Sequence, residues 1–182
     1  MAKKKTESSE DFPTMTFQSQ ILTHADFSNQ QLSKSDFSYA ALRYALFRSS
    51  DLLESLFVEA DVQKAIFRAA RIKKANFFKA YLPQCNLQKV QAKQANFGSA
   101  VLQNASMEGS NFEGCNFSGA DLQFANVRGS NFAEATFSGT DLRGVVYNEK
   151  TQWPENFQPQ DYGAIPVEWL PSEPVFEEDK EK

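Results

Sequence analysis

The sequence predicts an all-β solenoid, a quadrilateral β-helix with four pentapeptides in each coil. Three regularities in its 182 residues predict this fold. An apolar residue stands at every fifth position from Phe17 to Tyr147, a small residue stands two places before most of them, and residue types repeat again at every twentieth position. At 41% hydrophobic residues, random placement does not give such a series without interruption, so periodicity is the main structural signal.

The five-residue period requires the chain to bend within each unit, because it matches neither a helix nor a strand. We expect a short extended piece that points the small residue and the apolar centre inward, followed by a turn. In the C-terminal half, glycine stands two places after the centre and supplies the positive φ of a type II turn: Gly109, Gly114, Gly119, Gly129, Gly139 and Gly144. Because the N-terminal half has no glycine in this slot, we expect other turn types there.

The twenty-residue period predicts how the coils stack. One column of centres is phenylalanine throughout: Phe17, Phe37, Phe57, Phe77, Phe97, Phe117 and Phe137. The column offset by five residues is aliphatic throughout: Leu22, Leu42, Val62, Leu82, Leu102, Leu122 and Leu142. Four pentapeptides per coil place such residues above one another at the spacing of paired strands, ~4.8 Å, and residues 15–147 then make about seven coils.

The stretches Ala75-Asn76-Phe77, Ala95-Asn96-Phe97 and Ala120-Asp121-Leu122 carry a recognisable motif. It resembles the pentapeptide-repeat family, written A-(D/N)-L-x-x, and the cyanobacterial members in particular. The resemblance implies a right-handed β-helix. The regular spacing of Asp and Asn before the centres predicts hydrogen bonds that stabilise the turns rather than catalytic carboxylates.

Four segments are expected along the chain. Residues 1–14 form a disordered leader, and residues 15–147 form the β-helix. Residues 148–171 are rich in aromatic side chains and are expected to cap the last coil, as a solenoid end requires. The stretch from Tyr147 to Phe157 also resembles the segment that follows the repeats in many cyanobacterial members. Residues 172–182 form an acidic disordered tail.

The chain offers little material for catalysis or for metal binding. It has one histidine, His24, and two cysteines, Cys85 and Cys115, which occupy small inward slots in different layers. We expect both thiols to be buried, free and inert, as suits a reducing cytoplasm. The sequence has neither a glycine-rich phosphate loop nor an apolar run long enough to span a bilayer. We therefore expect no enzyme activity, no catalytic or metal site and no cofactor.

Charge separates the functional alternatives that the resemblance suggests. The quinolone-resistance and mycobacterial gyrase-binding members imitate DNA with an acidic rod. Here the net charge of -4 comes from residues 148–182, whereas the repeats carry a run of bases between residues 62 and 107 without a single Asp or Glu. This basic run argues against a DNA-mimicking gyrase binder. Nucleic-acid binding through the same bases is a further alternative, disfavoured by the low overall charge of the repeats.

Apolar residues in outward slots give the leading functional hypothesis. The slot that usually holds Asp or Asn is occupied by Leu46, Leu56 and Ile66. Arg48 and Arg68, which carry the same charge, are expected to lie above one another one coil apart. Departures from a strong repeat rule mark candidate functional surface. We expect a cytoplasmic protein–protein interaction module, regulatory in role, and monomeric or dimerised end to end. The candidate partner surface is Tyr44, Leu46, Arg48, Leu56, Ile66, Arg68, Arg71, Lys73 and Lys74.

Overall fold

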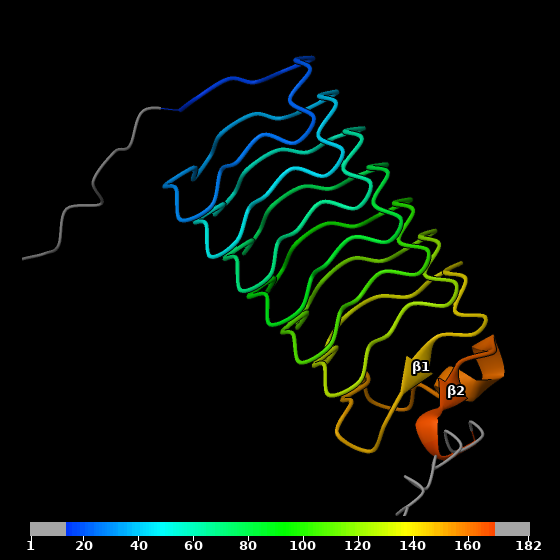
Figure 1. Ribbon diagram of the computed structural model, residues 1–182. Helices are drawn as coiled ribbons and strands as arrows, with labels where there is room; N and C mark the ends of the chain where they lie inside the picture. The colour runs from blue at the N-terminus through cyan, green and yellow to red at the C-terminus, as the bar shows by residue number, and fades with distance from the viewer. Residues whose placement is uncertain (1–13, 170–182) are drawn as a thin grey trace, which may run out of the picture.

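The computed structural model describes residues 14–169 as a stack of coils that closes at its C-terminal end (Figure 1). Parallel single-residue bridges join each coil to the next, and almost every bridge links residues twenty apart, from Thr16–Asp36 to Asn126–Val146. The leader predicted for residues 1–14, apart from Thr14, lies outside the described residues, as does the acidic tail predicted for residues 172–182.

Four walls follow from this register, and each is named by its buried column. Wall 1 contains Phe17 and every twentieth residue after it, wall 2 starts at Leu22, wall 3 at Phe27 and wall 4 at Leu32. Walls 1 and 3 therefore lie opposite each other. Within a wall, the residues directly before and after each buried centre point outward, because side chains alternate along an extended backbone. The next residue forms the corner.

The corner residues adopt one conformation throughout the repeats. Glycine corners have φ between 64° and 72°, and corners occupied by other residues have φ between 54° and 63°. Typical turns close with the same hydrogen bond, for example from Ala75 N–H to the Ile72 carbonyl at 3.1 Å. The expectation of other turn types in the N-terminal half is therefore wrong: the pairing of the coils holds Lys, Glu and Tyr in the left-handed region that glycine adopts freely.

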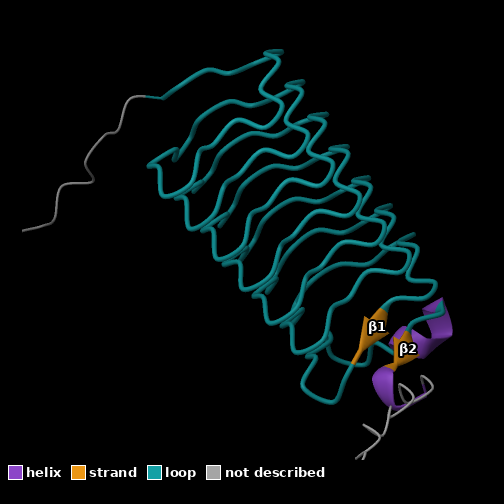
Figure 2. Ribbon diagram, viewed as in Figure 1, coloured by secondary structure: helices purple, strands orange, loops and turns teal. Residues whose placement is uncertain are grey.

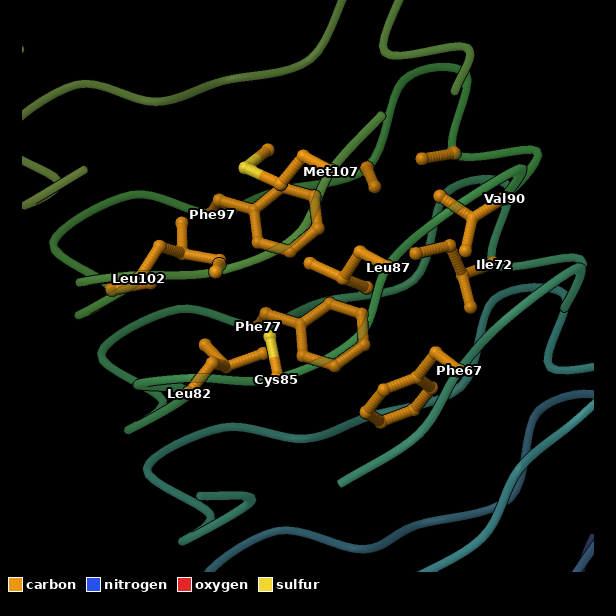
Figure 3. Packing of buried hydrophobic residues seen from close by; sticks show 14 of the residues in the cluster. Phe67, Ile72, Phe77, Leu82, Cys85, Leu87, Val90, Phe97, Leu102 and Met107 are labelled. Carbon is orange, nitrogen blue, oxygen red and sulfur yellow. The ribbon is translucent and has the colours of Figure 1, made fainter. Parts of the chain in front are cut away.

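The core consists of aromatic and aliphatic ladders that run along the solenoid (Figure 3). The predicted phenylalanine column is confirmed, since its neighbouring rings are nearly parallel and lie 4.7 to 5.4 Å apart. Wall 3 adds a second ladder from Phe27 to Phe67, which meets the first edge-on. Continuous packing of this kind makes each coil a platform for the next, so the outward residues stand on a rigid base.

The Asp and Asn residues before the centres hold the backbone in place. Asp36 Oδ1 accepts a hydrogen bond from the Ser38 N–H at 2.8 Å, and Asn96 Oδ1 accepts one from the Gly98 N–H at 3.0 Å. The same bond recurs at Asp26, Asp51, Asp61, Asn76, Asn86, Asn111, Asn116, Asp121, Asn126, Asn131 and Asp141. The structural role predicted for these residues is confirmed.

The only regular elements among the described residues lie at the C-terminal end (Figure 2). Strand β1 (Val146–Tyr147) pairs in parallel with β2 (Ile165–Pro166), and the short 3-10 helices η1 (Pro159–Tyr162) and η2 (Val167–Trp169) flank β2. Trp153 stacks on Phe132 at 5.2 Å, and Phe157 stacks on Phe137 at 5.0 Å. Aromatic side chains thus cover the end of the apolar core.

Candidate interaction surface

Five of the predicted surface residues lie together on wall 3 and its edge. Leu46, Arg48, Ile66 and Arg68 are outward residues of wall 3, and Tyr44 stands at the corner between walls 2 and 3. Leu46 and Ile66 are bridge partners on neighbouring coils. The structure therefore joins these five residues into one patch.

The other predicted residues lie on different walls. Arg71 and Lys73 point outward from wall 4, and Lys74 stands at the corner between walls 4 and 1. Leu56 belongs to wall 1, on the side of the solenoid opposite Leu46. The candidate surface is thus divided, and only its wall 3 part is continuous.

The apolar part of the wall 3 patch is two rungs long. The Phe47 N–H donates to the Ile66 carbonyl at 2.8 Å, which fixes Leu46 and Ile66 side by side, each half-buried. Asp26 precedes this pair in the same slot and Asn86 follows it. Polar residues therefore bound the apolar stripe at both ends.

An aromatic ladder borders this stripe at the corner between walls 2 and 3. His24 and Tyr44 stack with ring centres 4.8 Å apart and planes at 4°, and the Lys64 ammonium lies 5.5 Å from the centre of the Tyr44 ring. Tyr44 remains 42% exposed. His24 was not among the residues predicted for the partner surface, although the spacing of twenty between His24, Tyr44 and Lys64 places them in one column.

Ion pairs compensate the basic residues of wall 4. Arg71 lies 2.9 Å from Asp51, Lys74 lies 3.8 Å from Glu54, and both pairs confirm what the column register predicts. Lys93 adds a third pair with Glu113 at 2.6 Å, and this hydrogen-bonded partner raises the pKa of the lysine. Wall 4 therefore offers less free positive charge than its sequence indicates.

Four bases on wall 3 or its corners lack such a partner, whereas Arg128, farther along the same wall, pairs with Glu108 at 3.6 Å. Among residues 14–169, Arg48, Arg68, Lys64 and Lys89 make no ion pair, and all four lie on wall 3 or its corners. The rows 44–49, 64–69 and 84–89 contain no Asp or Glu. We call the outward side chains of these three rows the basic surface. Arg48 and Arg68 occupy the same outward slot on neighbouring coils, an arrangement that is unfavourable for folding alone because like charges on neighbouring strands repel.

A smaller apolar cluster lies on wall 1. Leu56 is 37% exposed, Val58 and Phe78 point outward from neighbouring coils, and the Phe78 ring rests against Gly98. The Lys79 ammonium lies 5.4 Å from the centre of the Phe78 ring and also approaches Glu59. The ring contacts and the paired charge give this cluster a structural explanation that the basic surface lacks.

The described residues contain few groups with the chemistry of a metal or nucleophile site. No group of three or more potential metal ligands occurs within residues 14–169, and no helix of this part is long and apolar enough to cross a bilayer. Cys85 and Cys115 are free and buried, and burial raises the pKa of the Cys115 thiol to about 12. A protonated, enclosed thiol is a poor nucleophile.

The stacked coils and their register define a four-sided β-helical solenoid. The sequence matches eight copies of the pentapeptide repeat, over residues 16–48, 35–73, 75–114, 95–132 and 110–146. The chain therefore belongs to the pentapeptide-repeat family, whose members form right-handed β-helices and are in general structural or binding proteins rather than enzymes. No curated protein sequence matches the chain.

Several solved structures resemble the chain. HetL, a pentapeptide repeat protein involved in heterocyst differentiation regulation from the cyanobacterium Nostoc sp. strain PCC 7120, is 20% identical with a TM-score of 0.38, covering 84% of this chain and 87% of HetL. QnrB1, a plasmid-mediated fluoroquinolone resistance protein, is 17% identical with a TM-score of 0.41, covering 84% and 89%. A pentapeptide repeat protein from the Arabidopsis thaliana thylakoid lumen is 23% identical with a TM-score of 0.33, covering 72% and 68%.

Proposed function

We propose that the chain is a non-enzymatic protein–protein interaction module that acts in the cytoplasm and uses the basic surface to bind a regulated partner. The observation that carries the proposal is the combination of a half-buried apolar stripe, Leu46 with Ile66, and the guanidinium groups of Arg48 and Arg68, which make no ion pair within the described residues. Both features depart from the repeat rule, since Asp or Asn in the stripe slot would bond the turn and a mixed charge pair would avoid repulsion.

The rigidity of the solenoid supports a binding role. Each outward residue of the basic surface stands on a buried Phe, Leu or Ala of a continuous ladder, so its backbone position is fixed before any partner arrives. A preorganised surface loses less conformational entropy on association than a mobile loop does. The free, buried thiols of Cys85 and Cys115 suit a reducing compartment and support the cytoplasmic assignment.

The charge distribution separates this proposal from its alternatives. A protein that imitates DNA needs a surface of negative charge, whereas the basic surface has four unpaired bases and no acid in its three rows. A protein that binds duplex DNA through about 6–10 phosphate contacts needs more bases than the four of this surface, and an apolar stripe has no role there. A protein partner accounts for both the bases and the stripe.

Loss of the apolar stripe tests the proposal directly. Leu46→Asp combined with Ile66→Asp is expected to abolish capture of the partner from a lysate, because two carboxylates then replace the apolar contact. The fold is expected to survive, since Asp26 occupies the same slot and bonds its turn through the Ser28 N–H. Affinity capture with quantitative mass spectrometry, beside far-UV circular dichroism and thermal melting, gives the measurement.

Leu56→Asp is the matched control, because it makes the same chemical change on wall 1. Capture lost with both variants would indicate a general defect, and capture kept by the Leu46→Asp, Ile66→Asp variant would remove the basic surface from consideration.

A further inference from the structure

The chemistry of the basic surface indicates which kind of partner it fits. Of the thirteen basic residues in the repeats, seven form ion pairs: Arg43, Arg71, Lys74, Lys79, Lys93, Arg128 and Arg143. Within the described residues the other six have none, and four of these lie on wall 3 or its corners. Positive charge is therefore locally concentrated, and an anionic partner would relieve it.

The geometry of wall 3 adds a spacing rule. Ile66 and Arg68 flank the buried Phe67 on one extended piece of backbone, so their outward side chains are separated by two residues, about 7 Å. Leu46 and Arg48 repeat the arrangement one coil away. An extended ligand that runs along the coil has the same spacing between alternate side chains.

We propose that the basic surface binds an extended acidic segment of a partner protein, in which an apolar residue contacts Leu46 and Ile66 and a carboxylate two positions away contacts Arg48 and Arg68. This inference rests on the proposed function, because it names the partner class for the same surface. Tyr44 closes the apolar end of the patch, and Lys64 and Lys89 lie at its two corners, where further carboxylates of the segment meet them.

The arginines determine the specificity in this arrangement. A carboxylate that bridges the guanidinium groups of two arginines on neighbouring coils accepts charge-assisted hydrogen bonds and removes their mutual repulsion. An uncharged segment of equal hydrophobicity would leave both arginines uncompensated. Acidic and neutral ligands should therefore differ much more in affinity than their apolar contacts alone would allow.

The test measures binding of a fluorescein-labelled peptide of repeated Leu-Ser-Glu units to the full chain by fluorescence anisotropy. The matched peptide has Gln in place of Glu. We expect the acidic peptide to bind, with an affinity that falls as salt rises, and the neutral peptide to bind at least about tenfold more weakly. Equal binding of both peptides, or no binding of the acidic peptide, would overturn the inference.

Two double variants locate the binding site. Arg48→Gln with Arg68→Gln should weaken acidic-peptide binding by about tenfold or more. Arg128→Gln with Arg143→Gln removes the same charge from arginines that are ion-paired to Glu108 and Asp141, and it should change binding by less than about twofold. Equal losses in the two variants would show a nonspecific charge effect and overturn the inference.

Other occupants are outcomes of the same assay. A variant with Glu177→Gln, Glu178→Gln and Asp179→Asn tests whether the acidic end of the chain itself competes for the basic surface. Unchanged peptide affinity in this variant supports a separate partner. A tenfold gain in peptide affinity would overturn the inference. A labelled DNA duplex that binds more tightly than the acidic peptide would overturn the inference and favour nucleic acid as the ligand. The peptide assay uses purified protein and is independent of the capture experiment. If the acidic peptide does not bind but capture from the lysate still depends on Leu46 and Ile66, the acidic partner class is refuted and the proposed function stands.

Discussion

At the scale of single residues, the slots of the repeat decide the chemistry of each side chain. From Ser35 onward the slot two places before the centre is buried, so it holds small or medium side chains such as Ala, Ser, Cys, Thr or Val and excludes solvent from them. Cys85 and Cys115 stand in this slot, and burial raises the pKa of both thiols, to about 12 for Cys115. In the unfolded chain the same thiols ionise near their ordinary pKa of ~8.5.

This difference predicts that alkali destabilises the fold. A folded-state pKa above the unfolded value stabilises the native state fully below about pH 8.5 and progressively less as pH rises further. Each thiol should remove up to about 1.4 kcal/mol of unfolding free energy per pH unit in that range. Urea denaturation at pH 8 and pH 10 measures the effect.

The control for this prediction is Cys85→Ala with Cys115→Ala, because Ala65 and Ala95 occupy the same slots one coil earlier. The variant should lose less stability between the two pH values than the parent chain does. An identical loss in both proteins would show that the thiols do not carry the pH dependence.

At the scale of the turn, pairing between coils overrides local preference. The corners from Ser19 to Asn104 are held at positive φ without glycine, a conformation that costs other residues about 1–2 kcal/mol. The hydrogen bonds to the coils on both sides fix this geometry, and packing of the buried ladders offsets its free-energy cost. The uniform corner conformation could not be predicted from glycine content, because glycine indicates only the local preference of a corner and not the geometry that pairing between the coils imposes.

The strain at the corners predicts opposite effects for two exchanges in one column. Ala69→Gly should raise the free energy of unfolding by about 1 kcal/mol, since Ala69 has φ of 60° and gains nothing from its methyl group there. Gly109→Ala should lower it by about the same amount, although no atom lies within 4 Å of the added carbon. Denaturant titration measures both, and a destabilising Ala69→Gly would contradict the strained-corner account.

At the scale of the whole molecule, the period of twenty residues determines the arrangement of the surface. It places Leu46 beside Ile66 and Asp51 beside Arg71, and the structure shows both contacts. Charge compensation could be predicted only in part, because the reach of a long side chain such as Lys93 toward Glu113 depends on its rotamer. The C-terminal end also departs from the twenty-residue period, since the bridge between Asn131 and Gln152 joins residues twenty-one apart.

The basic surface illustrates the same limit. Its members follow from the columns of wall 3, and the sequence predicts five of them. The sequence does not reveal that Arg71 and Lys74 are neutralised by direct contact while Arg48 and Arg68 are not paired within the described residues, because that distinction depends on the distances between side-chain termini.

The separation of two labels along one corner tests the stacked register most directly. Ser19 and Ser99 occupy the same exposed corner four coils apart, so Ser19→Cys and Ser99→Cys can carry nitroxide labels in a background with Cys85→Ala and Cys115→Ala. Double electron–electron resonance should give one narrow distribution centred at about 19 Å, four times the spacing of paired strands. A broad distribution, or a mean beyond about 30 Å, would contradict a tube in which every twentieth residue lies one layer above the last.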